Sequence, residues 1–287
     1  MGQASGSIKD RGVKGLRFQD KRIVLSGASH IEPMGSITLF VDFIEDVAAD
    51  SPYYTITQSG TALTAGAIDG AAGAPTAGHG GWLGGKTDDV DAEIDEISFG
   101  GLGTGAGTPW MYPARAGNGV LITEFGFVIP TALTARQYYV GFSDDPTEGT
   151  GTNGSLNITG TYTQVSPATD AAGFIFSSLA TAPTVWKYAS VNGDTDGSMS
   201  ATNDVGPTGV VDAYTVLRTE IDSGGNAFFY SSSSGSASIG RQPVNAVGSV
   251  ATAVATTSAL LPIFTAAATT TTGVEWEIDY CFAAAPR

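Results

Sequence analysis

Cysteine, charge and long apolar runs are all scarce in this chain of 287 residues. The single cysteine, Cys281, rules out a disulfide within the chain and fits a reducing compartment such as the cytosol. Charged residues make up only 14% of the sequence, well below the roughly 25% of ordinary soluble domains. No apolar run approaches the roughly 18 residues of a membrane-spanning helix, and the first residues lack a signal-peptide pattern. We therefore expect no membrane partner.

Histidine is nearly absent too, which limits the chemistry that the chain can support. The two histidines, His30 and His79, have no set of cysteines that would complete a zinc site. No Gly-x-Ser-x-Gly motif, which presents the nucleophilic serine of many hydrolases, accompanies them. We expect no catalytic residue, no cofactor-binding residue and no enzymatic activity.

Positive charge is concentrated at one end of an otherwise acidic chain. The net charge is −15 and the isoelectric point is near 4.2, so we expect no nucleic-acid partner. Residues 1–22, however, hold six basic side chains against two aspartates, a net of +4, which leaves −19 for the rest. Such asymmetry is typical of an interaction tail, although a solvated terminus with incidental charge is the alternative. The basic residues are Lys9, Arg11, Lys14, Arg17, Lys21 and Arg22.

Glycine and β-branched residues are abundant, and both disfavour long helices. The chain contains 39 glycines, and its apolar segments are separated by turn signals such as Asn192-Gly193-Asp194 and residues 222–226. This pattern predicts an all-β sandwich or barrel. We expect strands at residues 36–43, 53–57, 120–129, 137–142, 173–177, 184–189, 214–221, 227–230 and 274–282.

The last predicted strand alternates along its whole length. Its even positions, from Trp276 to Phe282, are apolar, and its odd positions are mostly acidic. We expect one face of this strand to be buried and the other to be exposed to water.

These patterns divide the chain into three regions. Residues 1–35 are predicted to be an N-terminal arm. Residues 36–108 combine strands with Gly/Ala-rich loops, packed on or beside a sandwich formed by residues 109–287. Within the second region, residues 60–86 have no period and are predicted to form a long loop, which in compact proteins is usually functional or disordered.

Three stretches resemble the laminin-G-like, concanavalin-type jelly roll. They are a strand pair at 122–146, a Tyr-x-Val-x-Arg hairpin at 214–230 and a closing segment at 260–280. The resemblance covers about residues 110–282. It implies an antiparallel jelly-roll sandwich, preceded here by the arm and by the long Gly/Ala-rich loops.

The Gly-, Ala- and Thr-rich composition, the scarcity of cysteine and the N-terminal extension also resemble bacteriophage capsid decoration (cement) proteins. This resemblance implies a non-enzymatic virion protein, made in the host cytoplasm and placed on the capsid exterior. Its partner would be the major capsid protein lattice, and it would be a homo-oligomer, with a trimer favoured. The capsid contacts would be Lys9, Arg11, Lys14, Arg17, Phe18, Lys21 and Arg22, together with the loops.

The alternative is a receptor- or glycan-binding module of a phage tail fibre or spike. Sugar binding needs an exposed aromatic ring with polar neighbours. Trp82 lies in a glycine-rich loop and is the candidate glycan contact.

A polysaccharide-degrading enzyme is a more distant alternative. The resemblance extends to β-glucanases, whose catalytic strand reads Glu-x-Asp-x-x-Glu and supplies the two carboxyls that a retaining hydrolase needs. Residues 93–98 place Ser98 at the last position of this motif, and residues 277–282 place Phe282 there. We therefore expect the acidic residues of both strands to lie on faces exposed to water.

Calcium is the one metal that the sequence brings into consideration. Residues 192–198 alternate oxygen-bearing side chains, as a hard cation requires, and Asp194 and Asp196 are the candidate ligands. The segment lacks the downstream glutamate of an EF-hand, and turns of this composition are common without a metal. The acidic cluster at 88–96 is a second candidate. No other cofactor is expected.

Overall fold

The computed structural model describes twelve stretches of the chain, and nearly all of their secondary structure is β-strand. The exception is a short 3-10 helix, η1 (Pro113–Arg115). The predicted all-β fold class is therefore confirmed. The described part includes no helix that is long and apolar enough to cross a membrane. The described residues are 37–41, 54–58, 83–87, 94–100, 109–130, 133–145, 157–158, 164–165, 168–179, 184–196, 205–232 and 245–286.

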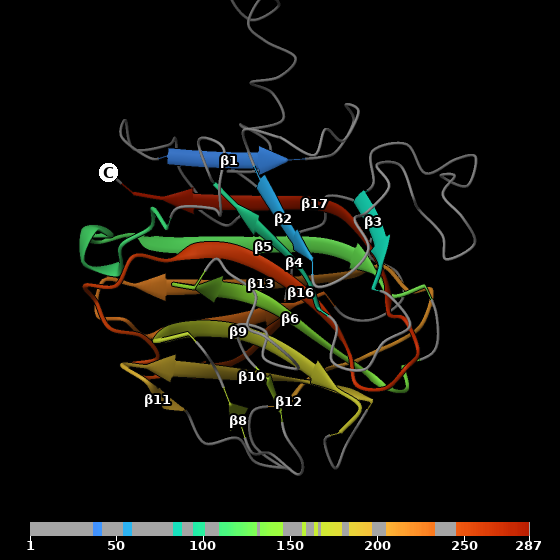
Figure 1. Cartoon of the computed structure of the whole chain (residues 1–287). Coiled ribbons are helices and arrows are strands. Elements are labelled where there is room, and N and C mark those ends of the chain that lie inside the picture. Colours follow the sequence, from blue (N-terminus) through green and yellow to red (C-terminus); the bar gives the residue numbers. More distant parts are fainter. Residues whose placement is uncertain are drawn as a thin grey trace, which may run out of the picture.

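Two antiparallel sheets form the body of the protein (Figure 1). The first, which we call the β5 sheet, contains in spatial order β1 (Ile37–Val41), β17 (Glu275–Ala285), β5 (Val120–Val128), β13 (Thr215–Asp222), β14 (Ala227–Ser231) and β15 (Asn245–Val250), with β3 (Leu83–Lys86) also paired to β17.

The second sheet, which we call the β6 sheet, packs against the first. It contains in spatial order β11 (Thr195–Asp196), β10 (Val185–Asn192), β9 (Asp170–Ser177), β6 (Arg136–Ser143), β16 (Leu261–Ala268), β4 (Ile94–Phe99) and β2 (Tyr54–Gln58), with β12 (Val205–Thr208) also paired to β10. A separate pair consists of β7 (Asn157–Ile158) and β8 (Gln164–Val165).

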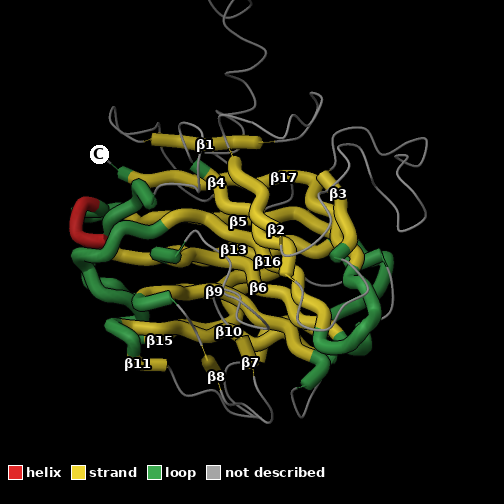
Figure 2. Tube along the Cα trace, viewed as in Figure 1, coloured by secondary structure: helices red, strands yellow, loops and turns green. Residues whose placement is uncertain are grey.

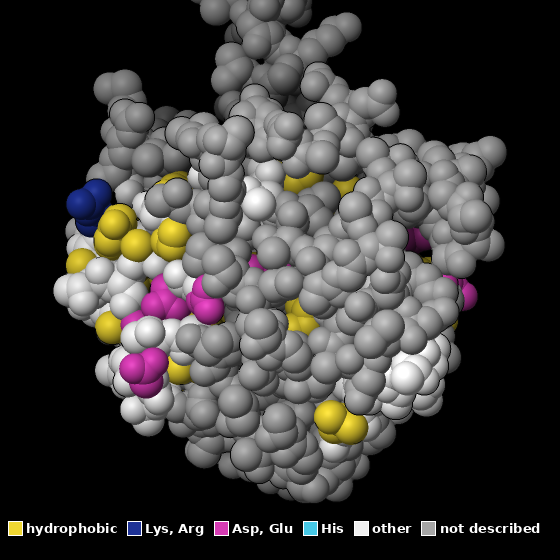
Figure 3. Space-filling view, viewed as in Figure 1, with side chains coloured by type: hydrophobic (Ala, Val, Ile, Leu, Met, Phe, Trp, Pro, Cys, Tyr) yellow, Lys and Arg dark blue, Asp and Glu magenta, His cyan; other side chains and the backbone are white. Residues whose placement is uncertain are grey.

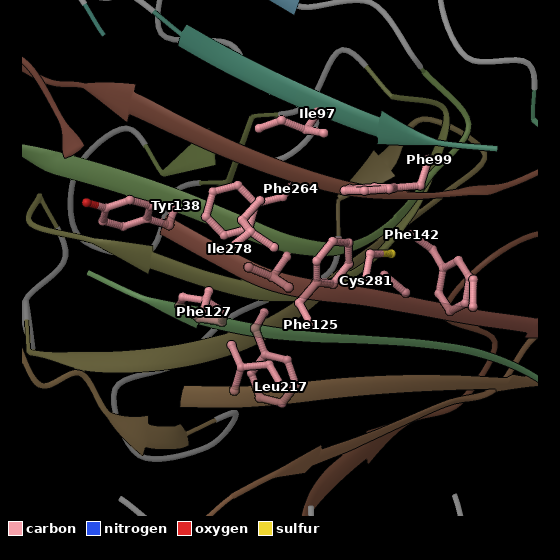
Figure 4. Packing of buried hydrophobic residues seen from close by; sticks show 14 of the residues in the cluster. Ile97, Phe99, Phe125, Phe127, Tyr138, Phe142, Leu217, Phe264, Ile278 and Cys281 are labelled. Atoms are coloured by element: carbon pink, nitrogen blue, oxygen red, sulfur yellow. The ribbon is translucent and has the colours of Figure 1, made fainter. Parts of the chain in front are cut away.

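Aromatic side chains from both sheets fill the space between them (Figure 4). The ring of Phe264, in β16, lies 5.6 Å from the ring of Phe127 and 6.2 Å from that of Phe125, both in the opposite sheet. All three side chains are completely buried. Because burying one such side chain contributes about 1.5–3 kcal/mol, these contacts hold the two layers together.

The predicted hairpin turns and strands are confirmed. Gly193 and Asp194 connect β10 to β11, and their φ angles of 56° and 61° are those that a two-residue type I′ turn requires. Residues 222–226 connect β13 to β14. The nine strands expected from the sequence correspond to β1, β2, β5, β6, β9, β10, β13, β14 and β17.

Strands from residues 36–108 belong to both sheets. β1 is an edge strand of the β5 sheet beside β17, whereas β2 and β4 extend the β6 sheet beyond β16. The stretch 60–86, predicted to be a loop, contains β3 at its end, paired with β17. The part of this stretch before Leu83 lies outside the described residues.

The alternation predicted for the last strand is wrong in its second half. Trp276 and Ile278 lie in the core, as expected. A β-bulge between Ile278 and Tyr280 then shifts the register of β17 against β5 by one residue. After the bulge Cys281 enters the core, whereas Tyr280 and Phe282 pack together on the opposite face of the sheet.

Candidate functional site

Most of the site residues predicted from the sequence fall outside the described stretches. These are the arm residues Lys9, Arg11, Lys14, Arg17, Phe18, Lys21 and Arg22, and the candidate glycan contact Trp82. Of the two calcium candidates, Asp194 is exposed in the β10–β11 turn and Asp196 ends β11. Within the described stretches, no three His, Cys, Asp or Glu side chains are grouped so that they hold a metal ion. A calcium site that uses residues 192–198 stays a prediction.

Several connecting segments meet at one end of the sandwich, which lies on the left in Figure 1 and carries η1, drawn red in Figure 2. The segment 251–260 is central, because it connects β15 of the β5 sheet to β16 of the β6 sheet. We call this surface the loop end. Its segments are 112–116, 143–145, 168–170, 192–195, 222–226 and 251–260.

Asp170, the first residue of β9, holds three of these segments together. Its carboxylate accepts hydrogen bonds from the backbone N–H of Ala255 at 2.6 Å, from that of Gly193 at 3.4 Å and from the Ser258 hydroxyl. Its own backbone N–H donates to the carboxylate of Asp144 at 3.1 Å. Asp170 is only 1% exposed. These charge-assisted hydrogen bonds compensate for the burial of its carboxylate.

The segment 251–260 is also held from both sheets at Thr252. The side-chain oxygen of Asn226 accepts a hydrogen bond from the Thr252 N–H at 2.9 Å, and the side-chain amide of Asn192 donates to the Thr252 carbonyl at 2.7 Å. Asn226 is fixed in turn by Asp222, whose carboxylate accepts from the Asn226 side-chain amide at 2.9 Å. Thr252 itself is exposed. The loop end therefore presents exposed groups on a fixed backbone.

Gly225 lets the β13–β14 turn approach this segment closely. Its φ angle is 78°, and a β-carbon at this position would lie 2.3 Å from the carbonyl oxygen of Val254. The N–H of Val254 donates to the carbonyl of Gly225 at 3.2 Å. Both the backbone angle and the close approach require glycine here.

Tyr112 places an aromatic ring at the loop end. It directly precedes η1, and the N–H of Ala114 donates to the carbonyl of Thr256 at 2.9 Å, which ties η1 to segment 251–260. The guanidinium carbon of Arg115 lies 4.6 Å from the centroid of the Tyr112 ring, within the range of a cation–π interaction. Tyr112 is half-buried and Arg115 is exposed.

Carboxylates outnumber basic groups at the loop end. Figure 3 shows acidic side chains gathered on this side of the molecule, below a basic group at its upper rim. The basic side chain in the segments that form the loop end is Arg115. The carboxylates belong to Asp144, Asp145, Asp170, Asp194 and Asp222.

Two of these carboxylates have shifted pKa values, in opposite directions. Burial raises the pKa of Asp144 above its usual value, and the nearby charge of Asp170 contributes to the increase. Partial burial also disfavours the anion of Asp222. Hydrogen bonds from the side chain and backbone of Asn226 outweigh this effect and lower the pKa of Asp222.

The described acidic residues of the two glucanase-like strands are buried, so the prediction that they face water is wrong for them, and Glu93 lies outside the described residues. Asp95 points into the core, where its carboxylate accepts a hydrogen bond from the indole N–H of Trp276 at 2.9 Å. Glu96 is completely buried, and Glu277 and Asp279 are 7% and 8% exposed. For Asp95 the physical reason is that it shares the core-facing side of β4 with Ile97 and Phe99.

Sequence reasoning did not single out Asp170, Asn192 or Asn226 as organisers of this surface. Asn192 and Asn226 lie in turns that the sequence does predict. Because Asn side chains in turns often form hydrogen bonds with the backbone, these two residues could have been named as candidates from the sequence. Asp170 carried no such signal, because its partners Ala255 and Ser258 are 85 and 88 positions away in the sequence.

The chain shares its fold with known proteins but matches no family. No protein-family model matches it, and no curated protein sequence does. Peanut lectin with a nine-residue peptide is similar at 10% identity, over 87% of this chain and 97% of its own, with a TM-score of 0.50. The Emp47p carbohydrate recognition domain is similar at 7% identity, over 90% and 99%, with a TM-score of 0.50.

A phage protein is also among the similar structures. The CBM2 module of the evolved Dit protein of Lactobacillus casei BL23 phage J-1 is 11% identical, over 88% of this chain and 96% of its own, with a TM-score of 0.44. Peanut lectin and the Emp47p domain show that this chain has a lectin-like jelly-roll fold.

Proposed function

We propose that this protein is a non-enzymatic glycan-binding module. The observation that carries the proposal is the fixed backbone of Thr252. It is hydrogen-bonded by Asn226 of the β5 sheet and by Asn192 of the β6 sheet. A segment held in this way presents its exposed groups in one conformation before a ligand arrives. Binding then costs little conformational entropy, which favours recognition of a small polar ligand.

The side chains of the loop end match the chemistry of a sugar. Sugar hydroxyls donate and accept hydrogen bonds, and Asp194, Asn192 and Thr252 supply acceptors and donors there. The ring of Tyr112 offers an apolar face with a polar tip. Two proteins of the same fold, peanut lectin and the Emp47p carbohydrate recognition domain, carry carbohydrate binding in their names, which supports this class of ligand.

The same structure supports binding without catalysis. A retaining glycosidase needs two carboxyls about 5–5.5 Å apart on either side of the scissile bond. Asp95, the middle acid of the first glucanase-like strand, is engaged in the core by Trp276. Ser98 and Phe282 stand at the positions where the motif requires its second glutamate.

A glycan array probed with the full-length protein tests the proposal, followed by calorimetric titration of the best ligand. We expect Tyr112→Ala and Asp194→Asn each to weaken binding about fivefold, which corresponds to one hydrogen bond or contact of about 1 kcal/mol. Asparagine tolerates the left-handed backbone at position 194, so this variant removes the charge and one acceptor oxygen without straining the turn.

Leu179→Ser is the matched control, because Leu179 is exposed beyond the far end of β9. We expect it to bind like the wild type. Failure of the array to show any ligand, or unchanged affinity in both loop-end variants, would contradict a glycan site at the loop end.

A second candidate is a capsid decoration protein on the exterior of a phage virion. The observation that favours it is a contrast in charge. Residues 1–22 have a net charge of +4, whereas the remaining chain has a net charge of −19. A basic arm that orders on an acidic capsid surface would combine charge with burial of Phe18. Bound copies, as trimers or another homo-oligomer assembled in the host cytoplasm, would stabilise the lattice by linkage.

Co-sedimentation with phage particles tests this candidate. Replacing Arg11, Lys14 and Arg17 with serine should weaken attachment and reduce its dependence on salt, because three of the six positive charges of the arm are removed. Attachment that is as strong as that of the wild type, or no co-sedimentation of the wild type, would contradict the decoration role.

A further inference from the structure

The β5 sheet has a second face, directed away from the core, which we call the β5 outer face. The strand register aligns one outward side chain from each of four neighbouring strands in a single row. The row consists of Phe282 of β17, Glu124 of β5, Arg218 of β13 and Tyr230 of β14. The other outward residues of these strands include Ile122, Glu220, Phe228, Glu277, Asp279 and Tyr280.

The polar side chains of this face form a connected network. The hydroxyl of Tyr280 donates a hydrogen bond to the carboxylate of Glu124 at 2.6 Å. The guanidinium of Arg218 forms ion pairs with Glu124, at 3.8 Å, and with Glu220. Its guanidinium carbon also lies 5.9 Å from the ring centroid of Tyr230. The network therefore connects side chains of four neighbouring strands.

Negative charge exceeds positive charge on the β5 outer face. Glu124, Glu220, Glu277 and Asp279 contribute four carboxylates, against the single guanidinium of Arg218 among the residues named above. Carboxylates held close together in a partly dry setting produce a negative potential. A partner for this face should therefore carry several positive charges.

The face is also shielded from water. Tyr280 is completely buried, and Arg218 and Phe282 are each 3% exposed. Among the described elements, the main contacts of β5, β13 and β17 outside the β5 sheet are with the facing sheet and with η1.

We propose that the basic segment 9–22 of the same chain docks on the β5 outer face. This segment has six basic and two acidic side chains, so its net charge is opposite to that of the face. It also contains Leu16 and Phe18, whose apolar side chains match the Ile122 and Phe282 surface. Charge and apolar area together favour a stable contact.

The position of β1 gives this segment a short route to the face. Residues 23–36 link it to Ile37, the first residue of β1, which is the edge strand of the same sheet. Fourteen extended residues span up to about 46 Å. The centre of the face, at β5 and β13, lies two to three strands from β1, or about 10–15 Å. The link therefore allows intramolecular docking, which a high effective concentration favours.

Carbodiimide cross-linking of the full-length protein tests the proposal, because it joins lysines to carboxylates that are in contact. Three of the five lysines, Lys9, Lys14 and Lys21, lie in the docking segment. We expect peptide mass spectrometry to show these lysines joined to Glu220, Glu277 or Asp279. The yield should fall by about threefold or more in about 0.5 M salt, where the screening length is on the order of 4 Å.

Two variants and one isotope experiment make the test decisive. Arg11, Arg17 and Arg22→Ser keeps all three lysine reporters and leaves the sheet intact, and it should lower the yield about threefold or more. Asp194→Asn, at the loop end, is the matched control and should leave the yield unchanged. An equal mixture of ¹⁴N and ¹⁵N protein should give cross-links within one isotope only.

Three outcomes would overturn the proposal. Cross-links confined to carboxylates of the loop end would place the segment elsewhere. Mixed-isotope cross-links would show that the occupant of the face is a second copy. A yield unaffected by the arginine substitutions would show that charge complementarity does not hold the segment on the face.

Discussion

The carboxylate of Asp170 accepts a hydrogen bond from the backbone N–H of Ala255 at 2.6 Å. Asp170 begins β9 in the β6 sheet, and Ala255 lies in the segment that carries the chain from the β5 sheet to the β6 sheet. This buried carboxylate is thus one of the groups that fix the path of the chain between the two layers. The loop end depends on this contact.

Asp170→Ala should lower the free energy of unfolding by about 3 kcal/mol. The substitution leaves the N–H groups of Ala255 and Gly193 and the hydroxyl of Ser258 without their charged acceptor. Urea denaturation measures the loss. Asp194→Asn, at an exposed turn position, is the control and should change stability by less than about 0.5 kcal/mol. A loss below about 1 kcal/mol for Asp170→Ala would show that the contact contributes little.

Asp144→Asn should make the protein more stable than the wild type at pH 7. Burial raises the folded-state pKa of Asp144, so this carboxyl favours folding at low pH, and that contribution is lost as pH rises through the folded-state pKa. Asparagine is neutral, so it avoids the cost of burying a charge. Its side-chain oxygen can still accept the hydrogen bond from the backbone N–H of Asp170. The gain should be below about 1 kcal/mol, because Asp144 is only partly buried. It should vanish near pH 3 in urea denaturation.

Asp222→Asn should have the opposite effect. The lowered folded-state pKa of Asp222 means that its carboxylate stabilises the fold above its unfolded-state pKa, and that this contribution is lost as pH falls through the folded-state value. The variant should therefore be less stable than the wild type at pH 7, and the difference should shrink in acid. Effects of the same sign in the Asp144 and Asp222 variants would contradict the opposite pKa shifts.

Gly126→Ala should destabilise the protein by about 1–3 kcal/mol through overpacking. A β-carbon at position 126 would lie 2.2 Å from the Tyr214 hydroxyl and 2.4 Å from the Tyr280 ring, so both rings must move. The hydrogen bond that Tyr214 donates to Asp279, now 2.6 Å long, would be disturbed as well. Chemical denaturation gives the loss. Gly224→Ala, whose β-carbon would have its nearest neighbour at 3.1 Å, should cost less than Gly126→Ala.

Removing calcium should leave the protein unchanged. Residues 192–198 lack the downstream glutamate of an EF-hand, and a bound ion at 100 times its Kd would add about 2.7 kcal/mol to stability. Thermal melting in EDTA and in millimolar calcium should therefore give the same Tm. A higher Tm with calcium, abolished by Asp194→Asn, would establish a site at residues 192–198.

Much of the fold was predictable because its signals are local. The turn at Gly193 and Asp194 follows from residues that adopt positive φ angles easily, and the turn at 222–226 follows from its glycines and its Asp and Asn side chains. Strands with a strict period of two, such as β13, were equally clear. The short strands β3, β11 and β12 and the longer β15 and β16 were not among the predicted strands, although each of them is paired in a sheet.

The sequence by itself determined the class of the fold, the positions of nine strands and of two turns, and the contrast between a basic segment and an acidic body. Each of these depends on composition or on residues close together in the chain. Only the tertiary structure decided that Tyr280 and Cys281 exchange faces at a bulge, that Asp95 is buried against Trp276, and that Asp170 anchors a distant segment. The physical reason is that the partners in these contacts come from strands that meet only when the two sheets have formed, so no local pattern encodes them.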